Sequence, residues 1–490
     1  MKSIWTYLIV GLFFVLFVTT NSSCKKDQII TDPGSTITFS ADSVLFDTVF
    51  TTIGSSTRNI RVRNPNKQRI SISKIYLEKG NASPFIINVD GAKGISHSDV
   101  EIAAQDSMYI FIQVNINPLN QSSPLIINDA IVFETNGNTQ KVHLEAWGQD
   151  AYYHYPNRTI KFSDGSYLPY SIISSNPNVD TTWANDKPHV IYGWLVVDSA
   201  QKLTIPAGTK VHLNNKAGLW VYRYGTLKVK GTYGNEVEFL GARNEPEYFD
   251  EPGQWDRIWI NEGSLENEID YAIIKNAYIG VQAELLGSNF NEPKRLRLTN
   301  TVIQNMSKWG LFGQAFNIYG GNNVISNCQE HGVNLQLGGN YKFIHCTFAN
   351  YWAKESKREL SNLRINNYTA QQVLPLDTCY FGNCVIYGSN PNEITLDINA
   401  SNMSFPPNYL FDNCALLTSI NTSDISKFRD NIVNKNPDFT DRFNYDFSLG
   451  NNTEFGPLTG TNVVNNTALF PVDITGTART GTIYAGAYHK

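Results

Sequence analysis

The amino-acid sequence predicts an all-β protein in two parts, a β-sandwich followed by a right-handed parallel β-helix. Three observations lead to this prediction. Only 17% of the residues are charged and Gly is frequent, a composition typical of short strands joined by polar turns. Residues 36–148 consist of alternating apolar and polar segments with turns at regular intervals. Residues 189–490 contain a degenerate internal repeat.

Length and charge limit the classes of function. A chain of 490 residues has room for two or three domains, and 41% hydrophobic residues are enough for sizeable cores. The net charge of -5 opposes a nucleic-acid partner, because such proteins normally present a basic surface. We therefore expect no nucleic acid among the partners.

The chain begins with a segment typical of secretion signals. The apolar run at residues 4–18 is shorter than the ~20 residues of a spanning helix, and small and polar residues lead from it to Cys24. This arrangement resembles the signal peptide of bacterial lipoproteins of the Bacteroidetes type, although Asn21 stands where the family usually has Leu. The resemblance implies that residues 1–23 are removed, that Cys24 carries lipid and that residues 24–35 form a linker. The protein would then be anchored in the outer membrane, on its periplasmic face or at the cell surface; a plain secreted protein is the alternative.

Residues 36–148 predict the β-sandwich. Short alternating strands are separated by turn residues about every ten positions. Val62, Asn64, Pro65 and the closing segment "VHLEAWG" resemble an immunoglobulin-like module of the Hydin/ASPM type. The resemblance implies a spacer or interaction surface. The module contains no Cys, so we expect no disulfide in it.

Residues 149–188 predict a connecting segment that packs on the first coils of the second part. The segment is rich in Tyr, Pro, Asn and Ser. Its aromatic rings could stack on sugars, but we favour their covering the open end of the core, since the ends of stacked repeats need a cap. The tyrosines are Tyr152, Tyr153, Tyr155, Tyr167 and Tyr170.

Residues 189–490 open with strands that alternate Val, Leu and Ile with polar residues, interrupted by glycines. The motifs "LTIPAGT", "GTLKVKGT" and "PGQWDRIWI" resemble the first coils of bacterial β-helix proteins with a pectate-lyase-like fold. Asp256 and Arg257 stand where that class has small residues, so we expect them to reach solvent or each other. The resemblance implies a fold and no particular activity, because this scaffold carries many functions.

Six short segments carry the repeat: "IIKNA", "VIQNM", "VISNC", "KFIHC", "YFGNC" and "LFDNC". Their Asn or His positions are separated by 29, 22, 18, 38 and 30 residues, which fits coils of about 20 residues lengthened by loops. We expect these side chains to form a ladder of hydrogen bonds between neighbouring coils at a turn. The ladder residues are Asn276, Asn305, Asn327, His345, Asn383 and Asn413.

The residue after each ladder position is small or contains sulfur, and four of the six are cysteines. A free Cys behaves as a small hydrophobic residue in a narrow core. We therefore interpret Cys328 as a core residue. Although His331 follows closely, no third group is apparent that would orient a catalytic pair. Cys379 and Cys384 alone make a weak zinc pattern, so no metal is expected.

The candidate ligand-binding residues lie in residues 350–372, an insertion between two repeats where aromatic and cationic side chains gather. The alternative is a short solvated helix, because Glu355 and Glu359 face basic residues at helical spacing. The candidates are Tyr351, Trp352, Lys354, Lys357, Arg358 and Arg364.

Two classes of function remain open. The first is a non-catalytic surface lipoprotein without a cofactor, whose β-helix binds a polysaccharide or a cell-envelope protein. The second is a polysaccharide lyase or glycoside hydrolase on the same scaffold. A lyase would use Lys or Arg with Ca²⁺, and a glycosidase would use two facing carboxylates. We favour the first class, because packing alone explains the repeat and no catalytic residue can be named.

Overall fold

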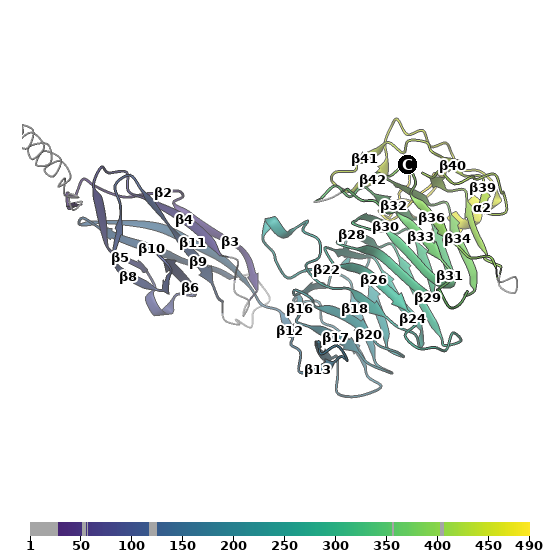
Figure 1. Ribbon diagram of the computed structural model, residues 1–490, viewed down its shortest axis with the longest axis horizontal. Coiled ribbons are helices and arrows are strands. Elements are labelled where there is room, and N and C mark those ends of the chain that lie inside the picture. The colour runs from purple at the N-terminus through teal and green to yellow at the C-terminus, as the bar shows by residue number, and fades with distance from the viewer. Residues whose placement is uncertain (1–27, 51–54, 56, 117–124, 355–356, 402–405) are drawn as a thin grey trace, which may run out of the picture. The chain divides into compact units, whose positions relative to one another are not determined.

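The computed structural model describes residues 28–50, 55, 57–116, 125–354, 357–401 and 406–490. These residues are almost entirely strands and loops, with two short 3-10 helices, η1 (Gly80–Ala82) and η2 (Pro246–Tyr248), and one α-helix, α2 (Thr461–Leu469). The predicted all-β class is confirmed. The chain divides into two compact units, Met1–Asp150 and Ala151–Lys490 (Figure 1). Cys24 and the predicted signal sequence lie outside the described residues.

The first unit contains two sheets that share one apolar core. Most of its strand pairs are antiparallel, as expected for a sandwich built from short alternating strands. In one sheet the order is β1 (Ile29–Ile30), β5 (Arg69–Leu77), β10 (Leu125–Thr135), β11 (Asn138–Gln149) and β3 (Ser43–Phe50), with β8 (Ser96–Ile102) also beside β5. In the other it is β2 (Thr38–Phe39), β4 (Arg58–Arg63), β9 (Ser107–Val114), β6 (Phe85–Val89) and β7 (Ala92–Gly94).

The alternation of residue types decides which side of each strand is buried in the first unit. On β9, Ile110, Ile112 and Val114 are buried, whereas Tyr109 and Phe111 between them are exposed. Successive side chains of a strand point to opposite faces, so the apolar set reaches the core together.

The second unit repeats one circuit of three strands. Each strand pairs in parallel with the equivalent strand of the next circuit, and Figure 1 shows the strands stacked from β17 and β18 at one end to β39 and β40 at the other. We call one circuit a coil and the three stacks of equivalent strands ladders A, B and C.

Ladder A contains β14 (Tyr167–Ile172), β17 (Trp194–Val197), β20 (Gly218–Val221), β23 (Ile258–Ile260), β26 (Ile279–Glu284), the first halves of β29 (Trp309–Gly321) and β31 (Val333–Ile344), β33 (Leu363–Asn366) and β36 (Ile394–Asp397). Ladder B contains β15 (Asp180–Thr182), β18 (Lys202–Pro206), β21 (Thr226–Lys230), β24 (Ser264–Asp270), β27 (Lys294–Thr299), the second halves of β29 and β31, β34 (Leu376–Gly382), β37 (Tyr409–Asp412) and β39 (Phe428–Arg429).

Ladder C is a separate sheet of 11 strands. It contains β12 (Tyr152–His154), β16 (His189–Ile191), β19 (Lys210–Leu213), β22 (Val237–Gly241), β25 (Ala272–Lys275), β28 (Val302–Met306), β30 (Val324–Cys328), β32 (Thr347–Asn350), β35 (Val385–Gly388), β38 (Ala415–Leu416) and β40 (Ile432–Val433). Three short strands lie outside the ladders: β13 (Arg158–Lys161) forms a hairpin with β14, and β41 (Phe439–Asp441) pairs with β42 (Asp446–Leu449).

The core of the second unit is built from rows of equivalent side chains. On ladder B, Phe343, Phe381, Phe411 and Phe428 follow one another in register. Their rings stack at centroid distances of 5.4, 4.9 and 5.3 Å, with interplanar angles of 16° or less. Parallel in-register strands place identical residues above one another, so the repeat in the sequence becomes a continuous stack in the core.

The turn positions of the predicted hydrogen-bond ladder share one backbone conformation. All six have positive φ, between 49° and 66°. Asn tolerates this left-handed conformation better than other residues with a side chain, which explains its recurrence at a bend repeated in every coil. The six residues are Asn276, Asn305, Asn327, His345, Asn383 and Asn413.

The side chains at these turns pair differently from the prediction. Of the six, the described hydrogen bonds join only His345 and Asn383 directly, with 3.0 Å between Nε2 and Nδ2. Asn276 donates instead to the carbonyl of Phe249, and Asn305 to the carboxylate of Asp250, both in the loop after η2. The conformation of the turn and the segments that cover it therefore account for these residues better than pairing from coil to coil.

The residue after each turn points into the core. Ala277, Met306, Cys328, Cys346, Cys384 and Cys414 are all 0% exposed. The interpretation of Cys328 as a core residue is confirmed, because its side chain belongs to the main core cluster. Burial also raises the pKa of its thiol to about 12. Nδ1 of His331 lies 2.6 Å from the carbonyl oxygen of Ser361. That ring nitrogen is therefore occupied by the backbone and does not activate the thiol.

The chain after β40 covers the outer face of ladder C. Val324 and Ala349, which point outward from that ladder, are buried against Phe447, Ile474 and Ala487 of the C-terminal segment. A second cluster joins β35 and β38 to α2 and the chain around it. The later strands of ladder C, from β28 to β38, are therefore covered on their outer side by the end of the chain.

The stack of coils begins earlier than the sequence predicted. β12, which contains Tyr152 and Tyr153, is already the first strand of ladder C. Trp183 belongs to the main core cluster and stacks on His189 at 3.9 Å, so it covers the first coil. Tyr155 stacks on Tyr192 of the next coil. Within the part of the chain described, no helix has the length and hydropathy needed to cross a bilayer.

Candidate functional site

The outer face of ladder A differs from that of ladder C in chemical character. Its outward side chains are aromatic at one end and then mostly amides and carboxylates. One row, in register, contains Trp220, Trp259, Gln282, Phe312, Asn334, Arg364 and Thr395. The next row contains Glu284, Gln314 and Gln336, with Asn366 and Asp397 in the following coils. We call these twelve residues the ladder A face.

A hydrogen-bonded network holds the middle of the ladder A face. The indole of Trp259 donates to the carboxylate of Glu284 at 2.7 Å, and Gln282 also donates to that carboxylate. Arg257 donates to the amide oxygen of Gln282 at 2.5 Å and is paired with the neighbouring Asp256. The expectation that Asp256 and Arg257 reach each other is therefore confirmed. The network fixes the orientation of Glu284 before any ligand arrives.

Glu284 is the chemically distinctive member of the network. Its side chain is largely buried on the outer surface of the strand, with 9% of the residue exposed. Burial raises the pKa of its carboxyl group, while the hydrogen bonds from Trp259 and Gln282 partly oppose that rise. A carboxyl group with a raised pKa can accept hydrogen bonds from a ligand and, when protonated, can donate one.

Two aromatic stacks lie beside the network. Trp220 and Trp259 stack at 4.6 Å with an interplanar angle of 12°. Trp309 and Phe312 stack at 4.7 Å and 14°, and the ammonium of Lys308 lies 4.2 Å from the Trp309 ring. Such flat rings are rigid apolar surfaces suited to the C–H face of a ring-shaped ligand.

The far end of the ladder A face is a second polar cluster. Asp397 accepts hydrogen bonds from Arg364 at 2.7 Å, from the hydroxyl of Tyr368 at 2.7 Å and from Asn366 at 3.2 Å. These partners lower the pKa of Asp397, although burial works against them. Asp397 therefore remains ionised near neutral pH.

Three of the six predicted ligand-binding residues belong to the packed corner between ladders C and A. Trp352 is 5% exposed. Arg358 is 1% exposed, and its guanidinium forms a buried ion pair with Glu393 at 2.5 Å. Tyr351 packs on Phe447 of the C-terminal segment, and burial raises its pKa to about 12. These three side chains hold the corner together and do not face a ligand.

The other three candidates, Lys354, Lys357 and Arg364, differ in exposure and do not lie on one surface. Lys354 is half-buried and Lys357 is exposed. Arg364 alone of the six lies on the ladder A face. The described residues between positions 350 and 362 contain no helix, so the alternative prediction of a short solvated helix does not hold there. Burial of Trp352 and Arg358 explains this, because they draw the segment onto the coil.

Sequence reasoning missed the network around Glu284. The strands "IGVQAE", "LFGQA", "VNLQL", "LRIN" and "ITLD" carry a polar residue at equivalent outward positions. Aligning strands of one ladder, rather than the turns, would have revealed this row. The signal is weak in the sequence, because an amide or carboxylate on a strand usually means only a solvated face.

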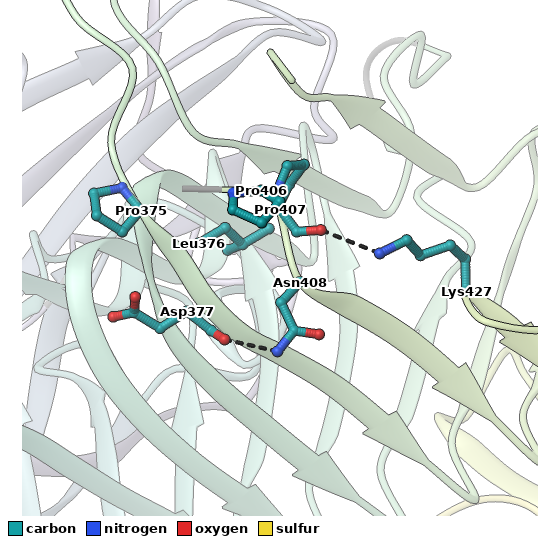
Figure 2. Close-up of a pocket in the computed structure, with 7 residues that line it drawn as sticks. All are labelled: Pro375, Leu376, Asp377, Pro406, Pro407, Asn408 and Lys427. Atoms are coloured by element: carbon teal, nitrogen blue, oxygen red, sulfur yellow. Dashed lines mark hydrogen bonds between the residues drawn. The ribbon is translucent and has the colours of Figure 1, made fainter. Parts of the chain in front are cut away.

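A cleft of about 480 Å³ lies between the starts of β34 and β37. Figure 2 shows its walls, in which Asn408 donates to the carbonyl of Asp377 at 2.8 Å and Lys427 to the carbonyl of Pro407 at 3.1 Å. Its other lining residues are Pro375, Leu376 and Pro406. Both hydrogen bonds join one wall residue to another, so they serve the cleft's own structure.

The carboxylates of the described residues form no group suited to a metal. No cluster of three or more His, Cys, Asp or Glu side chains that could hold an ion occurs among them. Glu262, the acid near Glu284, is fully buried and is held by Arg223 at 2.5 Å and by the backbone amide of Leu286. Glu262 therefore holds the loop after β26 in place by accepting a hydrogen bond from its backbone.

Comparison with known proteins adds general likenesses. No family model and no curated protein matches the chain. A PapD-like domain of human CEP192 is similar with 13% identity and a TM-score of 0.17, covering 26% of this chain and 95% of that one. A GH5 xyloglucanase of Bacteroides ovatus has 8% identity and a TM-score of 0.15, covering 36% and 38%. The catalytic domain of a GH87 α-1,3-glucanase has 10% identity and a TM-score of 0.14, covering 74% and 82%. These TM-scores are too low to carry an activity across.

Proposed function

We propose that the protein is a non-catalytic carbohydrate-binding protein whose ligand lies along the ladder A face. The single observation that supports this proposal is the combination of stacked aromatic rings with a row of amide and carboxylate side chains. Sugars need both: an apolar surface for their C–H faces and donors and acceptors for their hydroxyl groups.

The spacing of the row fits an extended polymer. Adjacent strands in a sheet lie about 4.8 Å apart, which is close to the length of one sugar residue in an extended chain. Glu284, Gln314 and Gln336 therefore follow one another at intervals that a polysaccharide could match unit by unit.

We propose further that the second unit is a right-handed parallel β-helix and the first an immunoglobulin-like spacer. The parallel pairing of all three ladders supports a β-helix. Connections between parallel strands of one sheet are right-handed in nearly all proteins, which supports the handedness. In this proposal Cys24 anchors the chain by lipid in the outer membrane, and the spacer separates the ligand face from the bilayer.

The alternative function is a polysaccharide lyase or glycoside hydrolase. The raised pKa of Glu284 favours it, because a general acid needs such a group. A glycosidase also needs a second carboxylate within about 5–9.5 Å. Asp397 lies four strand steps along the row from Glu284, on the order of 19 Å at the usual strand spacing. Glu262 is engaged with Arg223 and the backbone, so neither acid supports a catalytic pair.

Incubation of the purified protein with a panel of polysaccharides tests the proposal. We expect binding without release of soluble products. Trp259→Ala should weaken binding about tenfold or more, because it removes one stacking surface. Trp147→Ala is the matched control, since Trp147 is an exposed tryptophan of the first unit. Release of oligosaccharides that stops in Glu284→Gln would establish the enzyme instead.

Metabolic labelling with a radioactive fatty acid tests the anchor separately. The wild-type chain should take up label and Cys24→Ser should not. Equal labelling of the two would show that Cys24 is not the modified residue.

A further inference from the structure

The cations around the ladder A face are already neutralised by the protein's own carboxylates. Arg257 is paired with Asp256, and Arg364 with Asp397 at 2.7 Å. At the edge, Arg223 is paired with the buried Glu262 at 2.5 Å. A polyanionic ligand needs free guanidinium or ammonium groups, and breaking these pairs would leave carboxylates without partners.

One cation at this edge that has no ion pair among the described residues faces aromatic rings. The ammonium of Lys308 lies 4.2 Å from the ring of Trp309 and 5.5 Å from that of Tyr278. The ammonium group therefore makes cation–π contacts with these two rings and holds the Trp309 ring in position.

Glu284 is a carboxylate of the ladder A face that no ion pair within the described part of the chain neutralises. None of the ion pairs found among the described residues includes this carboxylate, whose partners are the indole of Trp259 and the amide of Gln282. An anionic ligand would meet it as a like charge, whereas a sugar hydroxyl would donate a hydrogen bond to it.

We propose, on the basis of the carbohydrate-binding function above, that the ligand is a neutral, extended polysaccharide and not a polyuronate or a sulfated glycan. Hexose units with equatorial hydroxyl groups fit best. They expose C–H groups to the ring of Trp259 and direct their hydroxyls sideways to Gln282, Glu284 and Gln314.

Binding of the purified full-length chain to neutral and acidic polysaccharides at low and high salt tests this inference. The probes are cellulose, β-mannan and mixed-linkage β-glucan on one side, and polygalacturonate, alginate and chondroitin sulfate on the other. We expect binding to at least one neutral polymer, with affinity changed less than about twofold between 0.05 and 0.5 M salt, because no net charge is neutralised.

The variant Glu284→Gln distinguishes a neutral from an anionic ligand, because the two cases predict changes in affinity in opposite directions. With a neutral ligand, loss of the stronger acceptor should weaken binding about three- to tenfold. With an anionic ligand, the same change removes a repulsion and should strengthen binding. Glu266→Gln is the matched control, because Glu266 is exposed at the start of a ladder B strand. Thermal unfolding of both variants checks that the fold is retained.

The outcomes separate the two proposals. Preference for an acidic polymer, with affinity raised in Glu284→Gln and lost at high salt, would overturn the neutral ligand and leave the carbohydrate-binding function standing. Absence of binding to every polymer of both sets would overturn the carbohydrate-binding function and the neutral ligand together.

Discussion

The outer faces of ladders A and C are built from the same strand alternation but carry opposite residue types. On ladder C, Val302, Val324, Thr347, Val385 and Ala415 occupy one row. On ladder A, the corresponding outward rows hold tryptophans, amides and carboxylates. The first face is covered by the C-terminal segment, and the second is the face that we propose to bind a ligand.

The difference shows how a repeated backbone obtains different surfaces. Inward residues must fill a narrow core in every coil, so they are apolar on all ladders. Outward residues depend on what lies over them: an apolar row needs a cover, and a polar row needs hydrogen-bond partners. The C-terminal segment supplies the cover for ladder C with Phe447, Phe455 and Leu458.

The largest effect is expected from removing the cover. Phe447 is 1% exposed and packs on Tyr351, 6.3 Å between ring centroids, and on Phe439 at 5.3 Å. Phe447→Ala should lower the free energy of unfolding by about 3–5 kcal/mol, because it leaves a cavity between the segment and ladder C. Urea unfolding of the wild-type protein and the variant measures this loss of free energy.

Trp309→Ala, beside the ladder A face, is the variant to compare with Phe447→Ala. It should cost less than about 2 kcal/mol of stability, because the ring is partly exposed and its loss opens no closed cavity. Equal losses of stability in the two variants would show that the ladder A face is as much a structural core as the covered face.

Acid should destabilise the second unit through its buried histidines. Burial lowers the pKa of His154 and His212, both on ladder C, to about 4, below the 6.5 of an unfolded histidine. The unfolded chain therefore binds more protons below pH 6.5, so this stability is complete above pH 6.5 and is lost as the pH falls toward 4. The loss should be about 2 kcal/mol per histidine between pH 7 and pH 5, and about 3 kcal/mol at pH 4.

The contribution of Glu284 to the pH dependence of stability is opposite to that of the histidines. Its pKa is raised in the folded state, so protonation favours the folded state as the pH falls. Urea unfolding at pH 7 and pH 5 measures the balance. His212→Gln should flatten the profile if this histidine contributes, and an unchanged profile in that variant would assign the acid sensitivity to other groups.

A smaller effect is expected at the bend that Asn327 forms near the end of strand β30. Asn327 has a φ of 49°. Asn327→Leu should cost about 1–2 kcal/mol, because a branched side chain disfavours this conformation. Asn327→Gly separates conformation from hydrogen bonding, since Gly accepts the φ but has no amide. A loss in Asn327→Gly as large as in Asn327→Leu would restore the predicted hydrogen-bond ladder as the reason for Asn.

The smallest effect is expected from the thiols of the core. Cys328→Ala removes one sulfur from a packed core and should cost about 1 kcal/mol. Cys328, Cys346, Cys384 and Cys414 are fully buried, so in the native protein they should react with a thiol reagent only at the rate of opening, and at once in denaturant. Fast modification of any of the four in the native state would reopen a reactive role.

The repeated features could be predicted from the sequence, because every coil imposes them again. The spacing of Asn276, Asn305 and Asn327 marks the same bend, and the Cys or Met after the bend marks the same core position. Strand alternation in residues 36–148 likewise predicted short strands, and the apolar sides of these strands form the core of the first unit. Local conformation and burial of this kind depend on near neighbours in the chain, so a pattern in the sequence carries them.

The tertiary structure alone decided which outward residues are free. Arg358 looked like a ligand-binding cation until Glu393, 35 residues along the chain, was found to neutralise it. Tyr351 looked like a sugar platform, but Phe447 lies on it. Glu284 gave no signal of its own, since its environment comes from Trp259 and Gln282 on two different strands. Whether a polar or aromatic side chain is available depends on segments distant in sequence that the packing of the coils brings beside it, and no local pattern encodes that.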